Sequence, residues 1–245
     1  MAKLTAFKLL SFDVYGTLID MQAGIESAFQ PTLSKSNLDG KIDRKTIMSA
    51  VSAASTPLQE QEPGLKYSAL LTKAHPEVAK KLGCTHDISE EESRAFGASV
   101  GSWPAFPDTV DALQRLQKFY KLVVLSNVDN DSFAACNAGP LEGFEFDAIL
   151  TAQDIGSYKP DPRNFEYMFK VAKEKFGVER EEVLQTAQSQ LHDHQPAKKH
   201  FGMKTSWIAR YGVVLGGSGE EPVWDWKFAT LGEMADAVEK EAAEK

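Results

Sequence analysis

The feature that most constrains the fold is the alternation of short β-rich runs with longer segments whose apolar residues have helical spacing. Parallel strands must be joined by crossover connections, and these are usually helices. This alternation is therefore typical of an α/β protein with a parallel sheet. The predicted strands are FKLLSFD (7–13), KLVVLSN (121–127), FDAIL (146–150), EVLQTA (182–187) and MKTSWI (203–208).

Amphipathic segments separate and follow the later strands. Apolar residues recur at helical spacing in segments 110–120 and 163–177. Segment 196–202 begins with a proline, which suits a first helical turn, and ends with a glycine. Near the C-terminus, a glycine-rich loop precedes a strand-like WKFA (226–229) and a helical segment, 231–245. The GGSG of that loop lacks the strand–helix context of a phosphate-binding loop, so we interpret it as a surface connection.

The segment between the first two predicted strands breaks this rhythm. It contains four helical patterns, separated by Asp39-Gly40, Pro63-Gly64 and Gly83, and no convincing strand. We therefore predict the α/β class, with a Rossmann-like parallel sheet core and an inserted α-helical cap domain. The predicted boundaries are 1–19 and 101–245 for the core and 20–100 for the cap.

Length, charge and cysteine content limit the possible functions. A chain of 245 residues suits one large domain that carries a smaller one. The formal net charge of −8 argues against nucleic-acid partners, which need a basic surface. No stretch approaches the roughly 18 apolar residues of a membrane span. Cys84 and Cys136 lie far apart without CxxC spacing, so we expect reduced thiols in a cytoplasmic protein.

Polar side chains follow the carboxyl ends of the predicted strands. In an open parallel sheet, ligands bind outside these ends, so we expect the polar groups to converge on one edge. A carboxylate, hydroxyls, an ammonium and a second carboxylate are suited to covalent catalysis on an anionic small molecule. The residues are Asp13, Thr17, Ser126, Asn127, Lys159 and Asp193.

Four segments then resemble a known family. Taken in order, FDVYGTL (12–18), VVLSN (123–127), SYKPDPRNF (157–165) and QSQLHD (188–193) resemble the four motifs of the haloacid dehalogenase superfamily. The resemblance covers nearly the whole chain, because the helical insertion stands where that superfamily carries its cap.

The resemblance assigns a role to five residues. It implies that Asp13 is the nucleophile and that the Ser126 hydroxyl orients the bound anion. It implies that Lys159 stabilises the nucleophile and the developing charge, and that Thr17 fixes the active-site loop. Asp193 falls on the acid of the fourth motif, although a residue just before Pro196 also suits an N-cap.

The resemblance implies that most members of the superfamily are magnesium-dependent phosphatases with an aspartate where this chain has Tyr15. Tyr15 therefore departs from the usual pattern. A phenol with a pKa of about 10 is a poor substitute for that acid in proton transfer. Gln188 likewise replaces an acid that helps to hold the metal. Mg²⁺ prefers octahedral oxygen coordination that includes carboxylates, so a site without two acids would bind it weakly. We expect no cofactor, and Mg²⁺ only if the protein is a phosphatase.

Both departures, together with YGTL and the Ser-Asn of the second motif, resemble the 2-haloacid dehalogenase branch. In that branch an aspartate displaces halide from a carbon atom, and water hydrolyses the resulting ester. The displacement needs no proton donor, so Tyr15 is compatible with it. The resemblance implies that Ser126, Asn127 and Lys159 bind the substrate carboxylate or tune the nucleophile. Asp193, with Gln190, would position the hydrolytic water. Tyr15 would either form a wall of the pocket or only pack under the cap.

The cap residues leave alternatives open. Dehalogenases of this branch hold the departing halide with a cap arginine, and neither Arg44 nor Arg94 lies in a matching context. Gln59, Gln61 and Tyr67 either face the substrate or form a solvated helix end.

His192 and His194 flank Asp193, and metal ligation, proton transfer and a solvated or capping role remain open for them. The leading hypothesis for the function is a metal-independent hydrolase of the 2-haloacid dehalogenase type, which acts through an aspartyl-enzyme ester on a small anionic substrate. The first alternative is a phosphatase on a small phosphorylated metabolite, with Mg²⁺ held by Asp13, a backbone carbonyl and Asp193. The second alternative is a non-catalytic binding protein. A homodimer would fit the resemblance.

Overall fold

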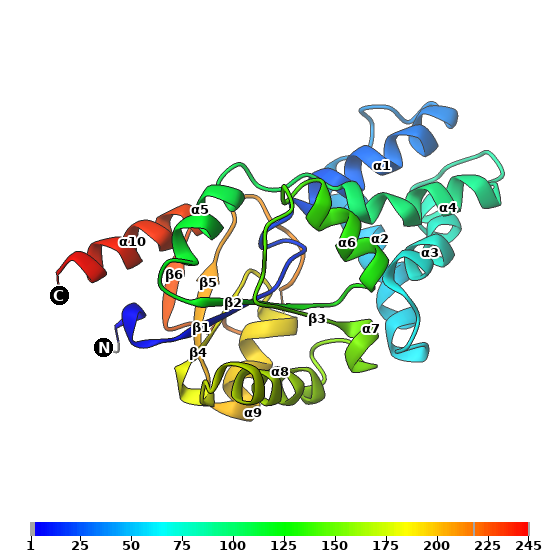
Figure 1. Cartoon of the computed structure of the whole chain (residues 1–245). Coiled ribbons are helices and arrows are strands. Elements are labelled where there is room, and N and C mark those ends of the chain that lie inside the picture. Colours follow the sequence, from blue (N-terminus) through cyan, green and yellow to red (C-terminus); the bar gives the residue numbers. More distant parts are fainter. Residues whose placement is uncertain (1–2, 218, 245) are drawn as a thin grey trace.

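A single parallel sheet forms the centre of the structure, a computed structural model that describes residues 3–217 and 219–244. Its strand order is β3-β2-β1-β4-β5-β6, and every pairing is parallel (Figure 1). The predicted α/β class is confirmed, while Met1, Ala2, Ser218 and Lys245 of the predicted core lie outside the described residues. The strands are β1 (Leu9–Phe12), β2 (Lys121–Ser126), β3 (Ala148–Thr151), β4 (Val183–Ala187), β5 (Lys204–Ile208) and β6 (Trp226–Phe228).

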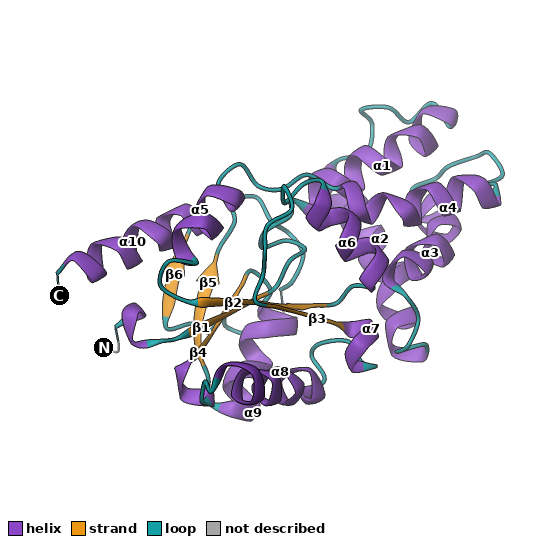
Figure 2. Ribbon diagram, viewed as in Figure 1, coloured by secondary structure: helices purple, strands orange, loops and turns teal. Residues whose placement is uncertain are grey.

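Helices cover both faces of the sheet (Figure 2). On one face lie α5 (Thr109–Leu116) and α10 (Leu231–Ala243), and on the other lie α8 (Pro162–Phe176) and α9 (Gln195–Phe201). All four had been expected from the sequence, α5, α8 and α10 from their helical patterns and α9 from its initial proline and terminal glycine. The short 3₁₀ turns are η1 (Leu4–Ala6), η2 (Ser99–Ser102) and η3 (Arg180–Glu182).

The two faces of the sheet have separate cores because successive strand residues point in opposite directions. Leu9, Val123 and Leu125 belong to the apolar cluster that includes α8 and α9. Leu10 and Val124 belong to the cluster that includes α5, α10 and the cap helices. Because β1 is buried on both sides, its residues are apolar apart from Ser11, and the first charged side chain is Asp13, where the strand has ended.

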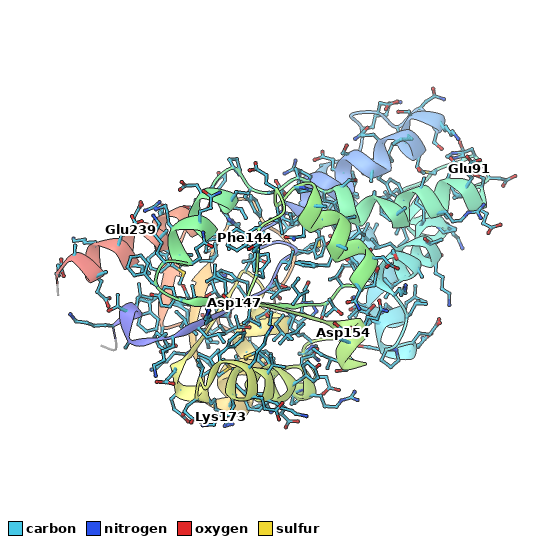
Figure 3. The ribbon with its side chains drawn as sticks, in the orientation of Figure 1. Glu91, Phe144, Asp147, Asp154, Lys173 and Glu239 are labelled. Carbon is cyan, nitrogen blue, oxygen red and sulfur yellow. The ribbon has the colours of Figure 1, made fainter. Side chains whose placement is uncertain are left out.

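Four helices fill the insertion between β1 and β2. They are α1 (Met21–Lys35), α2 (Arg44–Gln61), α3 (Tyr67–Lys81) and α4 (Glu90–Ala98). They lie beside the sheet, and the outer face of this group carries charged residues such as Glu91 (Figure 3). The exact boundaries proposed for the cap and core stay a prediction.

Two short helices had not been expected from the sequence. They are α6 (Asn130–Ala138) and α7 (Ala152–Ile155). The first packs small residues closely against the turn at 99–102, where a Cβ on Gly101 would lie 2.7 Å from that of Ala135. A helix that packs through alanine and glycine has no large apolar stripe, so periodicity does not reveal it.

An indole ring joins the cap to the first motif. Trp103 is 2% exposed and packs directly on α1, where a Cβ at Gly24 would come within 2.2 Å of the ring. Tyr15 meets the same indole edge-on, with 5.6 Å between ring centroids.

Among the described residues, no helix has the length and apolar character needed to cross a bilayer.

Candidate active site

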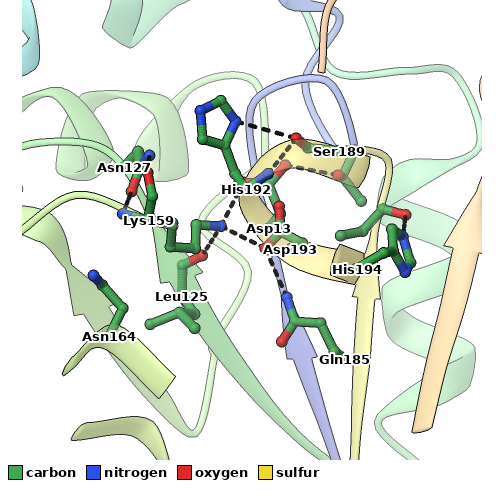
Figure 4. A network of polar contacts seen from close by, with 12 residues as sticks. Asp13, Leu125, Asn127, Lys159, Asn164, Gln185, Ser189, His192, Asp193 and His194 are labelled. Atoms are coloured by element: carbon green, nitrogen blue, oxygen red, sulfur yellow. Dashed lines mark hydrogen bonds and ion pairs between the residues drawn. The ribbon is translucent and has the colours of Figure 1, made fainter. Parts of the chain in front are cut away.

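Asp13 lies just beyond the carboxyl end of β1 and is 7% exposed. Lys159 Nζ donates to its Oδ1 at 3.0 Å (Figure 4), and the Thr17 hydroxyl donates to its Oδ2 at 2.8 Å. The turn between them passes through Gly16, whose φ of 97° is unfavourable for other residues. Each carboxylate oxygen therefore carries one charge-stabilising hydrogen bond and keeps lone-pair capacity for chemistry.

Thr17 is fixed from two directions. Its hydroxyl accepts a hydrogen bond from the Gln188 backbone N–H at 2.9 Å, which links the first motif to the fourth. Its carbonyl accepts from Arg210 at 2.9 and 3.1 Å, and Arg210 in turn pairs with Asp108 at 2.6 Å. Sequence reasoning missed Arg210, since no local pattern joins IAR to the first motif.

Lys159 is 1% exposed, and its ammonium makes three hydrogen bonds. The acceptors are Asp13 Oδ1 at 3.0 Å, Asp193 Oδ1 at 2.8 Å and the Leu125 carbonyl at 2.8 Å (Figure 4). Burial alone lowers the pKa of Lys159, but the two carboxylates outweigh it and the pKa is raised. An ammonium has three N–H donors, so none is left for a substrate.

Asp193 is fully buried in a π-helical turn, Gln190–His194, that follows β4. Its Oδ1 accepts from Lys159 and, at 2.9 Å, from the Gln185 amide, whereas its Oδ2 has no hydrogen-bond partner in the part of the chain that the structure describes. Burial raises the pKa of Asp193 to about 7, against the opposing effect of Lys159. The N-cap alternative is wrong, because the N-cap of α9 is His194 and no side chain caps it.

The second motif contributes two different kinds of group. The Ser126 hydroxyl is buried and has no hydrogen-bond partner among the described residues. Asn127 binds the backbone of Lys159 at both ends of its amide, with distances of 2.7 and 2.9 Å (Figure 4). Ser126 is thus available to a ligand, and Asn127 positions the lysine segment.

Five of the predicted site residues line a cavity of about 90 Å³ between the core and the cap: Asp13, Tyr15, Ser126, Asn127 and Lys159. Thr17 and Asp193 are not among its lining residues. A second cavity of about 180 Å³ shares six of its lining residues and continues along α2. Gln59 and Tyr67 face both cavities from the cap, whereas Gln61 does not line either. The first cavity is lined by Asp13, Tyr15, Met21, Gln59, Tyr67, Ser126, Asn127, Lys159, Ser189 and His192.

Tyr15 forms part of the wall of both cavities and packs against Trp103 and Tyr67. Burial raises the pKa of its phenol well above the usual value. The phenol is therefore neutral at physiological pH and does not serve as a base.

The two glutamines of the fourth motif bind a neighbouring loop. The Gln188 amide donates to the Leu215 carbonyl at 3.2 Å, and the Gln190 amide oxygen accepts from the Val223 N–H at 2.9 Å. Gln190 does not line the cavity that contains Asp13, so its predicted contact with substrate stays a prediction.

The two histidines have different surroundings. His194 is buried and donates through Nε2 to the Ala187 carbonyl at 2.9 Å, which is a structural role. His192 lines the cavity, and its Nδ1 lies 3.1 Å from the Ser189 hydroxyl (Figure 4). Burial, together with the Lys159 charge, lowers the pKa of His192 to about 4. Over the described part of the chain, no three His, Cys, Asp or Glu side chains cluster as metal ligands would.

The cap arginines considered from the sequence lie elsewhere. Arg44 pairs with Glu26 at 2.6 Å, and Arg94 lies 3.6 Å from Glu90 on the surface. No arginine is among the residues that line the cavity with Asp13.

Comparison with known proteins assigns the family. The chain matches the haloacid dehalogenase-like hydrolases over residues 7–184. It belongs to that family. The resemblance seen in the four motifs, and the hydrolase class it implied, are thereby confirmed.

Relatives and solved structures agree with this assignment. An (S)-2-haloacid dehalogenase of Pseudomonas sp. (strain YL) is 27% identical over 244 residues, which cover 96% of each protein. Haloacetate dehalogenase H-2 of Moraxella sp. (strain B) is 33% identical over 120 residues, 48% of this chain and 50% of that protein. The L-2-haloacid dehalogenase from Xanthobacter autotrophicus, with chloropropionic acid covalently bound, has a TM-score of 0.76 at 19% identity, over 95% of this chain and 98% of that one. At this identity the structural likeness shows the fold.

Proposed function

We propose that the protein hydrolyses the carbon–halogen bond of a small 2-haloalkanoic acid through an ester on Asp13. One observation carries the proposal: a carboxylate held by Lys159 and Thr17 opens on a small cavity whose wall has Tyr15 in place of a second acid. The relatives named as (S)-2-haloacid dehalogenases support the same reaction class.

In the first step, an oxygen of Asp13 forms a bond to the halogen-bearing carbon as the carbon–halogen bond breaks. The electron pair of that bond leaves with the halide, so no proton is transferred. In this proposal the substrate carboxylate binds the Ser126 hydroxyl, which lines the cavity and has no hydrogen-bond partner among the described residues. Lys159, which has no free N–H, orients Asp13 instead of holding the substrate.

In the second step, water attacks the ester carbonyl carbon of Asp13, and the bond between that carbon and the alkyl oxygen breaks. Asp193 is the proposed proton acceptor. Its Oδ1 lies at most 5.8 Å from Asp13 Oδ1, since both are bound to Lys159 Nζ at 2.8 and 3.0 Å. The proton that Asp193 accepts passes to the departing alkyl oxygen, which leaves as the hydroxyl of a 2-hydroxy acid. The second water proton goes to solvent as the Asp13 carboxylate is regenerated, and Lys159 stabilises the negative charge that develops on the ester oxygen.

The residues fit Mg²⁺ poorly, so the phosphatase alternative receives no support. Both carboxylates of the site are hydrogen-bonded to the same ammonium. Gln188, which stands at the position of a metal-holding acid, directs its amide to the Leu215 carbonyl. The proposed reaction therefore contains no step at a metal ion.

The test is chloride release from (S)-2-chloropropionate in the presence of EDTA, with Asp13→Asn as the matched control. We expect wild-type release to be unaffected by EDTA and the variant to be inactive. Release that depends on added Mg²⁺, or wild-type release no faster than that of the variant, would contradict the proposal. The cytoplasmic location and the homodimer stay predictions.

A further inference from the structure

Gln185 stands at a position where an apolar residue would be expected. It is the third residue of β4, a strand that lies between β1 and β5 and is buried along its whole length. Central strands of a parallel sheet are normally apolar. The Gln185 amide oxygen has no hydrogen-bond partner among the described residues, and a buried acceptor without a partner destabilises a fold. Packing therefore does not account for a glutamine at this position.

The amide nitrogen of Gln185 has one partner. Nε2 donates to Asp193 Oδ1 at 2.9 Å, and within the described part of the chain this is the only hydrogen bond of the Gln185 side chain (Figure 4). The same Oδ1 accepts from Lys159 Nζ at 2.8 Å, so the group that faces it must be a donor, which fixes the amide nitrogen on this side. Because Asp13 shares the Lys159 ammonium, Gln185 is the donor that serves Asp193 alone.

Under the proposed function, Lys159 has a second task during ester hydrolysis. It stabilises the negative charge that develops on the ester oxygen of Asp13 as water attacks, and an ammonium drawn toward that charge holds Asp193 less firmly. Asp193 still has to accept a proton in this step. A neutral amide with no other acceptor does not respond to the charge at Asp13, so it can hold the carboxylate throughout.

Resting on the proposed function, we infer that Gln185 is a positioning residue, whose amide N–H keeps the Asp193 carboxylate in place as the proton acceptor for ester hydrolysis. Gln185 lines neither the cavity that contains Asp13 nor the adjoining one, so it acts through Asp193 and not on the substrate. Asp193 takes part only in the second step of the proposed reaction. Halide release should therefore not depend on Gln185.

The charges around Asp193 give the direction of the pH effect. Burial raises the pKa of Asp193 to about 7, and the Asp13 charge acts in the same direction, whereas Lys159 and the amide oppose it. Lys159, whose pKa is raised, stays charged. His192 and His194 flank Asp193 in its turn, and burial lowers the pKa of each to about 4, so both stay neutral above pH 6. Removal of the amide donor should therefore raise the pKa of Asp193 further.

The test separates the two steps in single turnovers of (S)-2-chloropropionate by Gln185→Met, which keeps the approximate length of the side chain and removes the amide. We expect chloride release at the wild-type rate and accumulation of the ester on Asp13. The pH of half-maximal ester hydrolysis should rise by about 1–2 units, the effect of one hydrogen bond to a charged group, and hydrolysis should recover in alkaline solution. Gln185→Asn, whose amide is one methylene too short, should behave alike and replaces the methionine variant if that variant does not fold.

Thr205→Val is the matched control. Thr205 lies beside Gln185 on β5 and is buried, and its hydroxyl has no hydrogen-bond partner among the described residues, so neither step should change. Ester hydrolysis at the wild-type rate and pH dependence in the Gln185 variants would overturn the inference. Equal slowing of chloride release and hydrolysis at every pH would overturn it in favour of a purely structural role. If wild-type protein releases no chloride, the proposed function itself fails, which is a separate outcome.

Discussion

Replacement of Lys159 by methionine tests the electrostatics of the site. Methionine keeps most of the hydrocarbon stem of this 1%-exposed residue but removes the ammonium shared by Asp13 and Asp193. Removing one partner from a buried ion pair typically costs about 3–5 kcal/mol.

Protonation of one carboxylate limits this cost. For an acid with an ordinary pKa of about 3.9, taking up a proton at pH 7 costs about 4 kcal/mol. The loss of unfolding free energy in Lys159→Met is therefore about 3–4 kcal/mol at pH 7. A carboxyl group whose pKa is raised by folding stabilises the folded state less as the pH rises. The difference in unfolding free energy between wild type and Lys159→Met should therefore become smaller by about 1.4 kcal/mol for each pH unit toward acid. The slope reflects one proton more in the folded variant than in the folded wild type, in which burial already raises the pKa of Asp193 to about 7.

Urea unfolding at pH 5, 6 and 7 measures this deficit. The double variant Asp13→Asn/Lys159→Met has one buried acid fewer and should recover at least half of the lost free energy at pH 7. A Lys159→Met variant as stable as wild type at pH 7, or a deficit independent of pH, would refute the account of two acids that depend on one ammonium.

Three further predictions concern single side chains. Ser126→Ala removes a buried hydroxyl without a partner, so we expect stability within about 0.5 kcal/mol of wild type but a KM raised about 10-fold in halide-release assays. Asp193→Asn should stop ester hydrolysis, and its melting temperature relative to wild type should rise between pH 5 and 8, because the pKa of about 7 means that wild type loses stability over this range. Gly24→Ala places a Cβ 2.2 Å from Trp103 and should cost about 1–3 kcal/mol, a fall of roughly 2–4 °C in Tm per kcal/mol. Gly64→Ala, which meets no atom within 4 Å, is its control, and equal melting of the two would contradict the packing argument.

The sequence was sufficient to predict the sheet and to place the candidate nucleophile, Asp13, at its edge. Buried strands on both sides of β1 have to be apolar, so the polar residues that follow them are conspicuous. Asp13, Ser126, Lys159 and Asp193 each stand near the carboxyl end of a strand or in the loop beyond it, and parallel pairing brings those ends together.

The allocation of hydrogen bonds was beyond the sequence. Nothing in the local sequence pattern shows that all three N–H groups of the Lys159 ammonium donate to protein acceptors, or that the Gln190 amide oxygen accepts from the Val223 N–H. Arg210 was missed because its partner, the Thr17 carbonyl, lies 193 positions away in the chain. Such contacts depend on side-chain directions that only the packed structure fixes.

The central claim is that Asp13 becomes esterified during the reaction. The most direct measurement is a single turnover in ¹⁸O-labelled water with enzyme in excess over (S)-2-chloropropionate, followed by mass spectrometry of the peptide that contains Asp13. The account predicts a peptide heavier by one labelled oxygen and an unlabelled hydroxyl group in the product. Label in the product hydroxyl with an unlabelled Asp13 would mean that water attacks the substrate directly, and the account would be wrong.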